Sequence, residues 1–248
     1  MMVAIDPTKI LSVDDCEQER TPQELVDWVE EKNSLFARTE EGRNYVILRK
    51  GLAKKFIEEI YPLSLLAQQL FNGRGDVVCK PSLFEENFDA VIIDYRRRPL
   101  KIQKIKFTHA IRHYEKYLRT VYLQKYGYVS LLSKLMRNSN ENARNSPKRK
   151  NEIVGRVRGR KKELRVIAKA GERESNKRYG IDWSLVMVFD DYMTFISLGE
   201  LEQLEAFINT EVLPMGLDFG KLFLLSWSGN TLLEFSLGDS SSTGAQRT

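Results

Sequence analysis

The sequence predicts an α/β domain in which a mixed central sheet is flanked by helices, and three features lead to this prediction. An apolar run at Phe88–Ile93 and an alternating run at Leu100–Phe107 are separated by the short polar insert Asp94–Pro99, the pattern of a β-hairpin. The runs Trp183–Phe189 and Phe219–Ser226 are apolar on both faces, as in strands covered on two sides. Segments with helical spacing lie between these strands, which favours a layered α/β fold.

The first part of the chain predicts two helices and two short strands. Thr21-Pro22-Gln23-Glu24 is a helix start, with Thr at the N-cap and Pro in the first turn, and this helix should run to about Asn33. The run Gly51–Phe71 has helical spacing, and Pro62 is expected to kink this helix or split it in two. The short β-type runs are Asn44–Leu48 and Val77–Lys80.

After the hairpin, helices and strands alternate. The predicted elements are a helix at Thr108–Lys125, a strand at Tyr128–Leu132, a short strand at Ile153–Val157, a charged helix at Arg160–Arg178, a helix at Leu201–Leu213 and an edge strand at Thr231–Leu237. We expect the two apolar runs to form the core, with Trp183, Leu185, Val186, Val188, Leu222, Phe223 and Leu224 largely buried.

This order fits a single domain over residues 21–237. Residues 1–20 lack a regular pattern and are expected to form an irregular arm, whereas residues 238–248 have the composition of a disordered tail. The polar segment Asn138–Asn151 is expected to be a flexible basic loop.

Composition indicates a soluble, intracellular class of protein. Of the 248 residues 42% are hydrophobic, which is enough for a core. The chain has no apolar run of the roughly 18 residues that a membrane helix needs, so we expect no membrane association. The chain has two cysteines, Cys16 and Cys79, far apart in sequence, which favours free thiols in a reducing, cytoplasmic compartment.

Positive charge is concentrated in one segment of the chain. Residues 144–178 contain fourteen Lys and Arg and four acids, whereas the net charge of the whole chain is only +5, so the remainder is negative. Such an asymmetry indicates an anionic partner, nucleic acid first, although a solvated loop and helix face would have the same composition.

The hairpin headed by Asp89, its charged second strand, and the helix and core strands that follow resemble the restriction-endonuclease-like (PD-(D/E)xK) superfamily. Two phrases are similar to those of a loose group of uncharacterised bacterial proteins on this plan. The first is Tyr122-Leu123-Gln124-Lys125-Tyr126-Gly127-Tyr128-Val129, and the second is Lys177-Arg178-Tyr179-Gly180 followed by Leu185 to Tyr192. The resemblance covers about Asn72 to Leu237. It implies a restriction-endonuclease-like fold and a nuclease ancestry.

The resemblance also implies a metal site with a catalytic lysine. In active members two carboxylates hold Mg²⁺ or Mn²⁺ and a lysine assists the attacking water. Asp89 matches the first carboxylate and Lys104 the lysine, but Lys101 or Gln103 stands where the second acid is expected. The candidates to replace it are Glu85 and Glu86 in the preceding loop, and Glu58 and Glu59 on the upstream helix.

Other polar groups are weaker candidates for a site. His109 and His113 share the spacing of one helix face without a third ligand, and Asp190 and Asp191 follow a buried strand, where a plain turn is the simpler interpretation. No arrangement of a serine or cysteine nucleophile with a base is evident. The residues expected to contact nucleic acid are Arg96, Arg97, Arg98, Lys148, Arg149, Lys150, Arg156, Arg158, Arg160, Lys161 and Lys162.

These observations lead to two hypotheses. The first is a nucleic-acid-engaging domain that is either a weak metal-dependent nuclease or a degenerate relative that does not cleave. The alternative is a non-catalytic interaction subunit of a larger bacterial assembly, with a protein partner.

Overall fold

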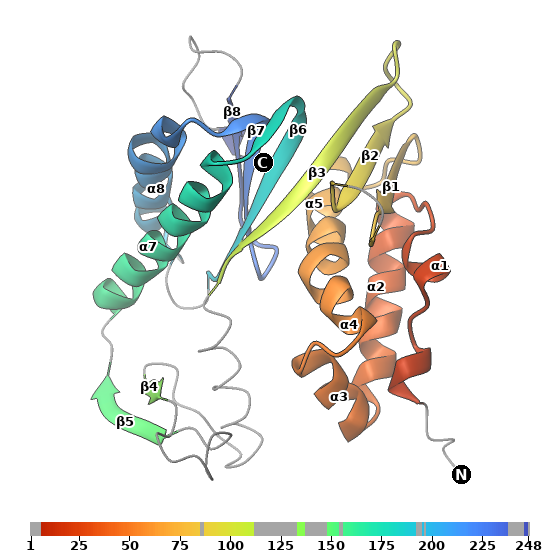
Figure 1. Ribbon diagram of the computed structural model, residues 1–248, viewed down its shortest axis with the longest axis horizontal. Helices are drawn as coiled ribbons and strands as arrows, with labels where there is room; N and C mark the ends of the chain where they lie inside the picture. Colours follow the sequence, from red (N-terminus) through yellow and green to blue (C-terminus); the bar gives the residue numbers. More distant parts are fainter. Residues whose placement is uncertain are drawn as a thin grey trace.

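The computed structural model describes residues 6–84, 87–111, 133–136, 148–153, 156–191, 195, 197–237 and 246–247. Within these residues the chain forms an α/β fold with a mixed sheet of strand order β1-β2-β3-β6-β7-β8-β9, flanked by helices (Figure 1). The predicted α/β class, with a mixed central sheet flanked by helices, is therefore confirmed. The strands of this sheet are β1 (Val77–Pro81), β2 (Ala90–Asp94), β3 (Lys101–Ala110), β6 (Arg178–Phe189), β7 (Asp218–Ser226), β8 (Leu232–Ser236) and β9 (Gln246–Arg247).

The sheet combines an antiparallel meander with two parallel crossovers. Strands β1, β2 and β3 pair antiparallel, β3 pairs parallel with β6, β6 pairs parallel with β7, and β8 returns antiparallel to β7. Both apolar runs near the C-terminus lie in the middle of the sheet, as predicted, because β6 and β7 have a strand on each side. A separate two-stranded sheet pairs β4 (Ser133–Met136) with β5 (Lys148–Ile153).

One helical layer covers each face of the sheet. Figure 1 shows the N-terminal helices, red to orange, on one side and α7 and α8 on the other. We call these the α2–α5 face and the α7–α8 face. The helices are α1 (Val13–Cys16), α2 (Pro22–Ala37), α3 (Glu40–Ile47), α4 (Leu52–Lys55), α5 (Tyr61–Phe71), α7 (Arg156–Ser175) and α8 (Leu198–Phe207).

Alternation along the strands divides the core between the two faces. Val186 and Val188 of β6 pack with the N-terminal helices, whereas Leu185, Met187 and Phe189 pack with α7 and α8. The predicted core residues are buried, except that Trp183 at the start of this run is only half-buried. None of the described helices is long and apolar enough to cross a membrane.

Several local predictions are confirmed in the N-terminal layer. Thr21 and Glu24 form the expected capping box, with the Thr21 amide donating to Glu24 Oε2 at 2.8 Å, and α2 continues to Ala37. Cys16 and Cys79 are free and buried. The predicted irregular arm contains a 3₁₀ turn (Pro7–Lys9) and α1, and its residues Ile10, Leu11 and Cys16 belong to the core.

The predicted β-type run Asn44–Leu48 is wrong, because these residues lie in helix α3 and its C-cap. Two contacts with residues that precede the run determine its conformation. The Thr39 hydroxyl caps the helix by accepting from the Gly42 amide at 2.9 Å, and Tyr45 stacks on Phe36 with ring centroids 6.1 Å apart. A short run has too little intrinsic preference to resist a cap and a packing partner.

The kink predicted at Pro62 takes the form of a π-helical turn. Residues Phe56–Ile60 form this turn between α4 and α5, and Pro62 stands in the first turn of α5. Proline has no N–H to donate to the carbonyl four residues earlier, that of Glu58. His109 Nε2 instead donates to the Glu58 carbonyl at 2.7 Å, so a β3 side chain satisfies the oxygen that Pro62 leaves without a helical partner.

The predicted helix Thr108–Lys125 begins too early. Thr108, His109 and Ala110 extend β3 and pair in register with Met187, Val188 and Phe189 of β6, so the parallel ladder determines their conformation. Residues 112–125 of that helix, the strand Tyr128–Leu132 and most of the loop Asn138–Asn151 lie outside the described residues.

The remaining C-terminal predictions differ mainly at their boundaries. The strand predicted at Ile153–Val157 is displaced, because β5 ends at Ile153 and α7 begins at Arg156. Helix α8 continues through a π-helical turn (Ile208–Val212) into a 3₁₀ turn (Leu213–Met215) that contains Pro214. In the predicted disordered tail, Gln246 and Arg247 form β9, and the other residues lie outside the described part.

Candidate functional site

Asp89 lies where β2 begins, at an edge of β3 that β2 no longer covers. The β2–β3 ladder ends with the pair Ala90 and Ile105, and the Asp89 amide donates to the Ile105 carbonyl at 2.9 Å. Beyond this point the Asp89 carboxylate replaces the missing strand, because its Oδ2 accepts from the Phe107 amide at 2.7 Å. A buried backbone donor requires such a partner, so part of the role of Asp89 is structural.

The other oxygen of Asp89 is bound by Lys106, a residue that the sequence did not single out. Lys106 Nζ lies 2.7 Å from Asp89 Oδ1, and the Asp89 side chain is only 8% exposed. Burial alone would lower the pKa of Lys106, but the hydrogen bond and charge of Asp89 outweigh it and raise that pKa. The ammonium group is therefore charged and held directly on the carboxylate.

The structure does not bring Gln103 to Asp89. Side chains alternate along a strand, and Gln103 lies on the α2–α5 face together with Ile105, where its amide donates to the Ser184 hydroxyl. Lys104 shares the opposite face with Lys106 but is engaged elsewhere. Its Nζ lies 5.6 Å from the ring centroid of Phe88 and 5.4 Å from that of Trp183, in cation–π geometry.

Glu59, in the π-helical turn, is the carboxylate that joins Asp89. Its Oε1 accepts from Lys55 Nζ at 2.7 Å, and its buried Oε2 accepts no hydrogen bond from any residue in the described part of the chain. The pKa of Glu59 is raised to about 7, chiefly because the side chain is buried and also because of the charge of Asp89, while the hydrogen bond and charge of Lys55 and the charge of Lys106 oppose the shift. The charges of Asp89, Lys55 and Lys106 thus all act on Glu59, and we call these four residues the carboxylate–lysine cluster.

The cluster does not fit the divalent metal that the resemblance implies. A cation held by Asp89 and Glu59 would meet the charged ammonium of Lys106, which already occupies one Asp89 oxygen. Within the described ranges, no group of three His, Cys, Asp or Glu side chains is placed to hold a metal ion. Gln103, one of the two residues that stand where the second acid is expected, is on the other face.

The other sequence candidates have structural roles or lie outside the described part. The Glu58 side chain forms an ion pair with Arg49, and His109 Nε2 donates a hydrogen bond to the Glu58 backbone carbonyl. Asp191, after β6, accepts from the Ser228 hydroxyl and, at 3.3 Å, from its amide, and so contacts the connection between β7 and β8. Glu85, Glu86 and His113 are not among the described residues.

The basic residues form two groups on different sides of the molecule. Arg96 makes a bidentate pair with Asp94, with Nε–Oδ1 at 2.8 Å and Nη2–Oδ2 at 2.7 Å, at the turn between β2 and β3. Helix α7 lies on the opposite face of the sheet. Lys148, Arg149 and Lys150 belong to β5, and Arg156 begins α7.

The basic side chains of α7 differ in how they are engaged. Arg160 donates to Glu200 and, at 2.8 Å, to Gln203, so it ties α7 to α8. Lys161, Arg165 and Lys169 are exposed and make no ion pair with any residue that the structure describes. They stand four residues apart, so they follow one line along the helix at a rise of about 6 Å each. We call them the α7 row.

Comparison with protein-family models, curated proteins and solved structures finds no match.

The raised pKa of Glu59 gives a testable pH dependence. A carboxyl whose folded-state pKa of about 7 exceeds its ordinary value of 4.5 favours folding below the lower value, and this contribution is lost as the pH rises to 7. We expect Glu59→Gln, which cannot ionise, to match the wild type at pH 5 and to be more stable by about 2 kcal/mol at pH 8. Urea unfolding at both pH values measures this. A difference that is the same at both pH values would contradict it.

Proposed function

We propose that this chain is a nucleic-acid-binding domain of restriction-endonuclease-like type that does not cleave through a metal-dependent site. The observation that carries the binding function is the α7 row. Its three cations are exposed, aligned and without an ion pair among the described residues, whereas Arg160 on the same helix is neutralised by α8. Aligned free cations on a helix are suited to a line of phosphates.

The sheet topology is consistent with the superfamily part of the proposal. An antiparallel meander whose second strand is headed by Asp89 leads into parallel strands through the crossover that contains α7. The carboxylate–lysine cluster supports the non-cleaving version. The charged ammonium group of Lys106 contacts the Asp89 carboxylate. It therefore neutralises the buried negative charge that a metal ion would otherwise neutralise.

Salt dependence of binding tests the α7 row directly. We expect wild-type affinity for a fluorescein-labelled DNA duplex to fall linearly in a plot of log K against log salt, because binding releases counterions. Replacing Lys161, Arg165 and Lys169 with Gln should reduce the slope by about 2.7, since each phosphate contact contributes about 0.9. The loss should be the same for unrelated duplex sequences, because phosphate contacts carry no sequence information.

The matched control removes three other exposed cations. Arg38, Lys50 and Lys54 belong to the N-terminal helical layer, and their replacement by Gln changes the net charge equally. This control variant should keep the wild-type slope. Equal losses in both variants would show a general charge effect, and no wild-type binding at about 50 mM salt would reject the nucleic-acid function and favour an interaction subunit.

A further inference from the structure

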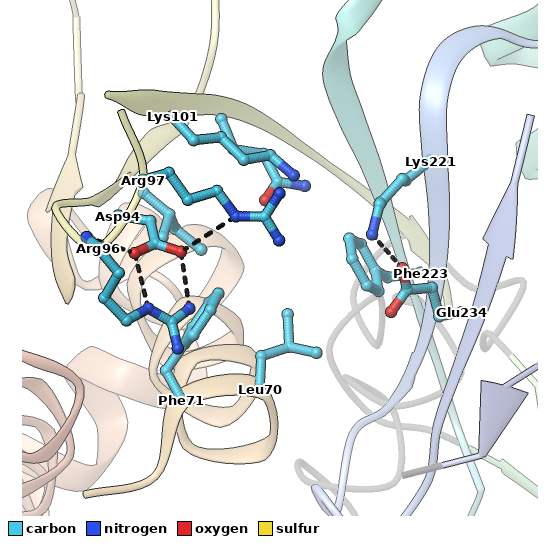
Figure 2. Close-up of a pocket in the computed structure, with 11 residues that line it drawn as sticks. Leu70, Phe71, Asp94, Arg96, Arg97, Lys101, Lys221, Phe223 and Glu234 are labelled. Carbon is cyan, nitrogen blue, oxygen red and sulfur yellow. Dashed lines mark hydrogen bonds and ion pairs between the residues drawn. The ribbon is translucent and has the colours of Figure 1, made fainter. Parts of the chain in front are cut away.

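A small basic pocket lies on the α2–α5 face of the sheet, away from α7. Its volume is about 170 Å³. Figure 2 shows Arg97 and Lys101 on one wall, at the β2–β3 turn, and Lys221 and Glu234 of β7 and β8 on the opposite wall. The apolar side chains that line it are Leu70, Phe71, Ile92 and Phe223.

The acids of the pocket are already neutralised, which leaves an excess of positive charge. Asp94 is held by Arg96 in the bidentate pair, and Glu234 pairs with Lys221. Arg97 Nε is 3.9 Å from Asp94 Oδ2, too far for a hydrogen bond, and Lys101 makes no ion pair with any described residue. Two cationic side chains, Arg97 and Lys101, are thus left with unused donors at one opening.

The surroundings of Lys101 disfavour its positively charged form. Burial lowers the pKa of Lys101, and the nearby charges of Lys221 and Arg97 lower it further. Like charges that crowd a partly desolvated space are stabilised by an anion placed between them. The bidentate pair also fixes Arg96 above the ring of Phe71, at 5.9 Å, so this wall is built before any ligand arrives.

The volume and charge of the pocket together restrict which anions it can bind. Pockets for drug-sized molecules usually measure about 300–1,000 Å³, so this one suits a single small group. A phosphomonoester has a charge of about −1.5 to −2 at neutral pH, which matches the two cations with unused donors, Arg97 and Lys101, whereas a carboxylate or an internal phosphodiester has only one charge. Arginine is also suited to bidentate phosphate contacts.

We propose that this pocket binds a terminal phosphate group, with Arg97 and Lys101 as its principal contacts and Lys221 facing it from the other wall. The phosphate belongs either to the end of a nucleic-acid strand or to a small free phosphomonoester, and both present the same dianionic group. The strand-end source rests on the proposed nucleic-acid function. Binding of the phosphate group itself does not, because the pocket and the α7 row lie on opposite faces of the sheet.

Calorimetric titration with inorganic phosphate tests the pocket independently of nucleic acid. We expect saturable binding to the wild type and at least a tenfold loss in the double variant Arg97→Gln, Lys101→Gln. Arg98→Gln is the matched control, because Arg98 is the next residue and does not line the pocket. The α7-row variant should bind phosphate like the wild type. No saturable heat up to about 10 mM phosphate, or equal affinity in the double variant, would overturn the proposal.

The source of the phosphate is decided by two oligonucleotides of one sequence, with a 5′-phosphate or a 5′-hydroxyl. A strand-end ligand predicts at least fivefold tighter binding of the phosphorylated strand to the wild type and no preference in the double variant. The wild type could instead bind both strands equally and still bind inorganic phosphate in calorimetry, with the phosphate binding lost in the double variant. That result would reject the strand end and assign the pocket to a free phosphomonoester. Loss of all oligonucleotide binding with phosphate binding retained would reject the proposed function alone.

Discussion

Val188→Asp is expected to prevent folding. Val188 is 1% exposed at the centre of β6 and belongs to the core cluster that includes Phe223 and the helices of the α2–α5 face. No positively charged partner is part of that cluster as described, so the carboxylate would be buried unpaired at a cost of several kcal/mol. This is comparable to the whole stability of a domain, about 5–15 kcal/mol.

The control for this change is Ile181→Asp on the same strand. Ile181 is 72% exposed, so its replacement should leave the melting temperature within a few degrees of the wild type. Circular dichroism and size-exclusion chromatography of both variants measure the effect. A monomeric Val188→Asp protein with an unchanged melting curve would show that β6 is not the central strand.

Lys106→Met is expected to destabilise the protein by about 3 kcal/mol, because it leaves one Asp89 oxygen buried without its ammonium partner. The loss should be smaller in the Asp89→Asn background, where no charge is left behind. A double-mutant cycle by urea unfolding isolates this coupling. The matched control is Lys104→Met, two residues away on the same face, which loses only cation–π contacts and should cost about 1 kcal/mol or less.

Equal costs for Lys106→Met and Lys104→Met, with no coupling to Asp89, would contradict the ion pair as the organising contact of the cluster. A stable Lys106→Met protein would likewise show that the buried carboxylate needs no positive charge. Either result would indicate that a group other than Lys106 is the main partner of the Asp89 carboxylate.

The fold class was predictable because the strongest patterns are also the most buried segments. The runs at β6 and β7 are continuous and apolar since each strand has a neighbour on both sides and a helical layer on both faces. The start of α2 was predictable because the capping box is local, so four residues contain all of its contacts. The hairpin was predictable for the same reason.

The missed elements depend on contacts between distant residues. Nothing near Thr108 in sequence indicates that a parallel partner, β6, will extend β3 to Ala110. The role of His109 follows from the carbonyl that Pro62 leaves free in a helix some fifty residues earlier, a contact that only the folded chain creates.

The candidate site was predictable only in part. Asp89 was singled out, and Glu59 was one of several possible carboxylates, but Lys106 was missed. The signal for Lys106 was the hairpin register, because counting back from the pair Asp94 and Lys101 places Asp89 opposite Lys106. Predicting it required the exact end of the turn, which local patterns define poorly. The partners of Gln103 and Lys104 follow from pairing with β6, which the sequence did not specify.

The metal dependence of nucleic-acid binding tests whether this chain binds nucleic acid without metal-dependent cleavage. Fluorescence anisotropy of a labelled duplex at about 50 mM salt, with either EDTA or Mg²⁺ in excess, measures affinity, and gel analysis of the same samples detects cleavage. We expect the protein to bind the duplex in EDTA and to leave it intact in both conditions. The affinities in EDTA and in Mg²⁺ should differ only by the effect of ionic strength. Cleavage that requires Mg²⁺ and disappears in Asp89→Ala would contradict this proposal.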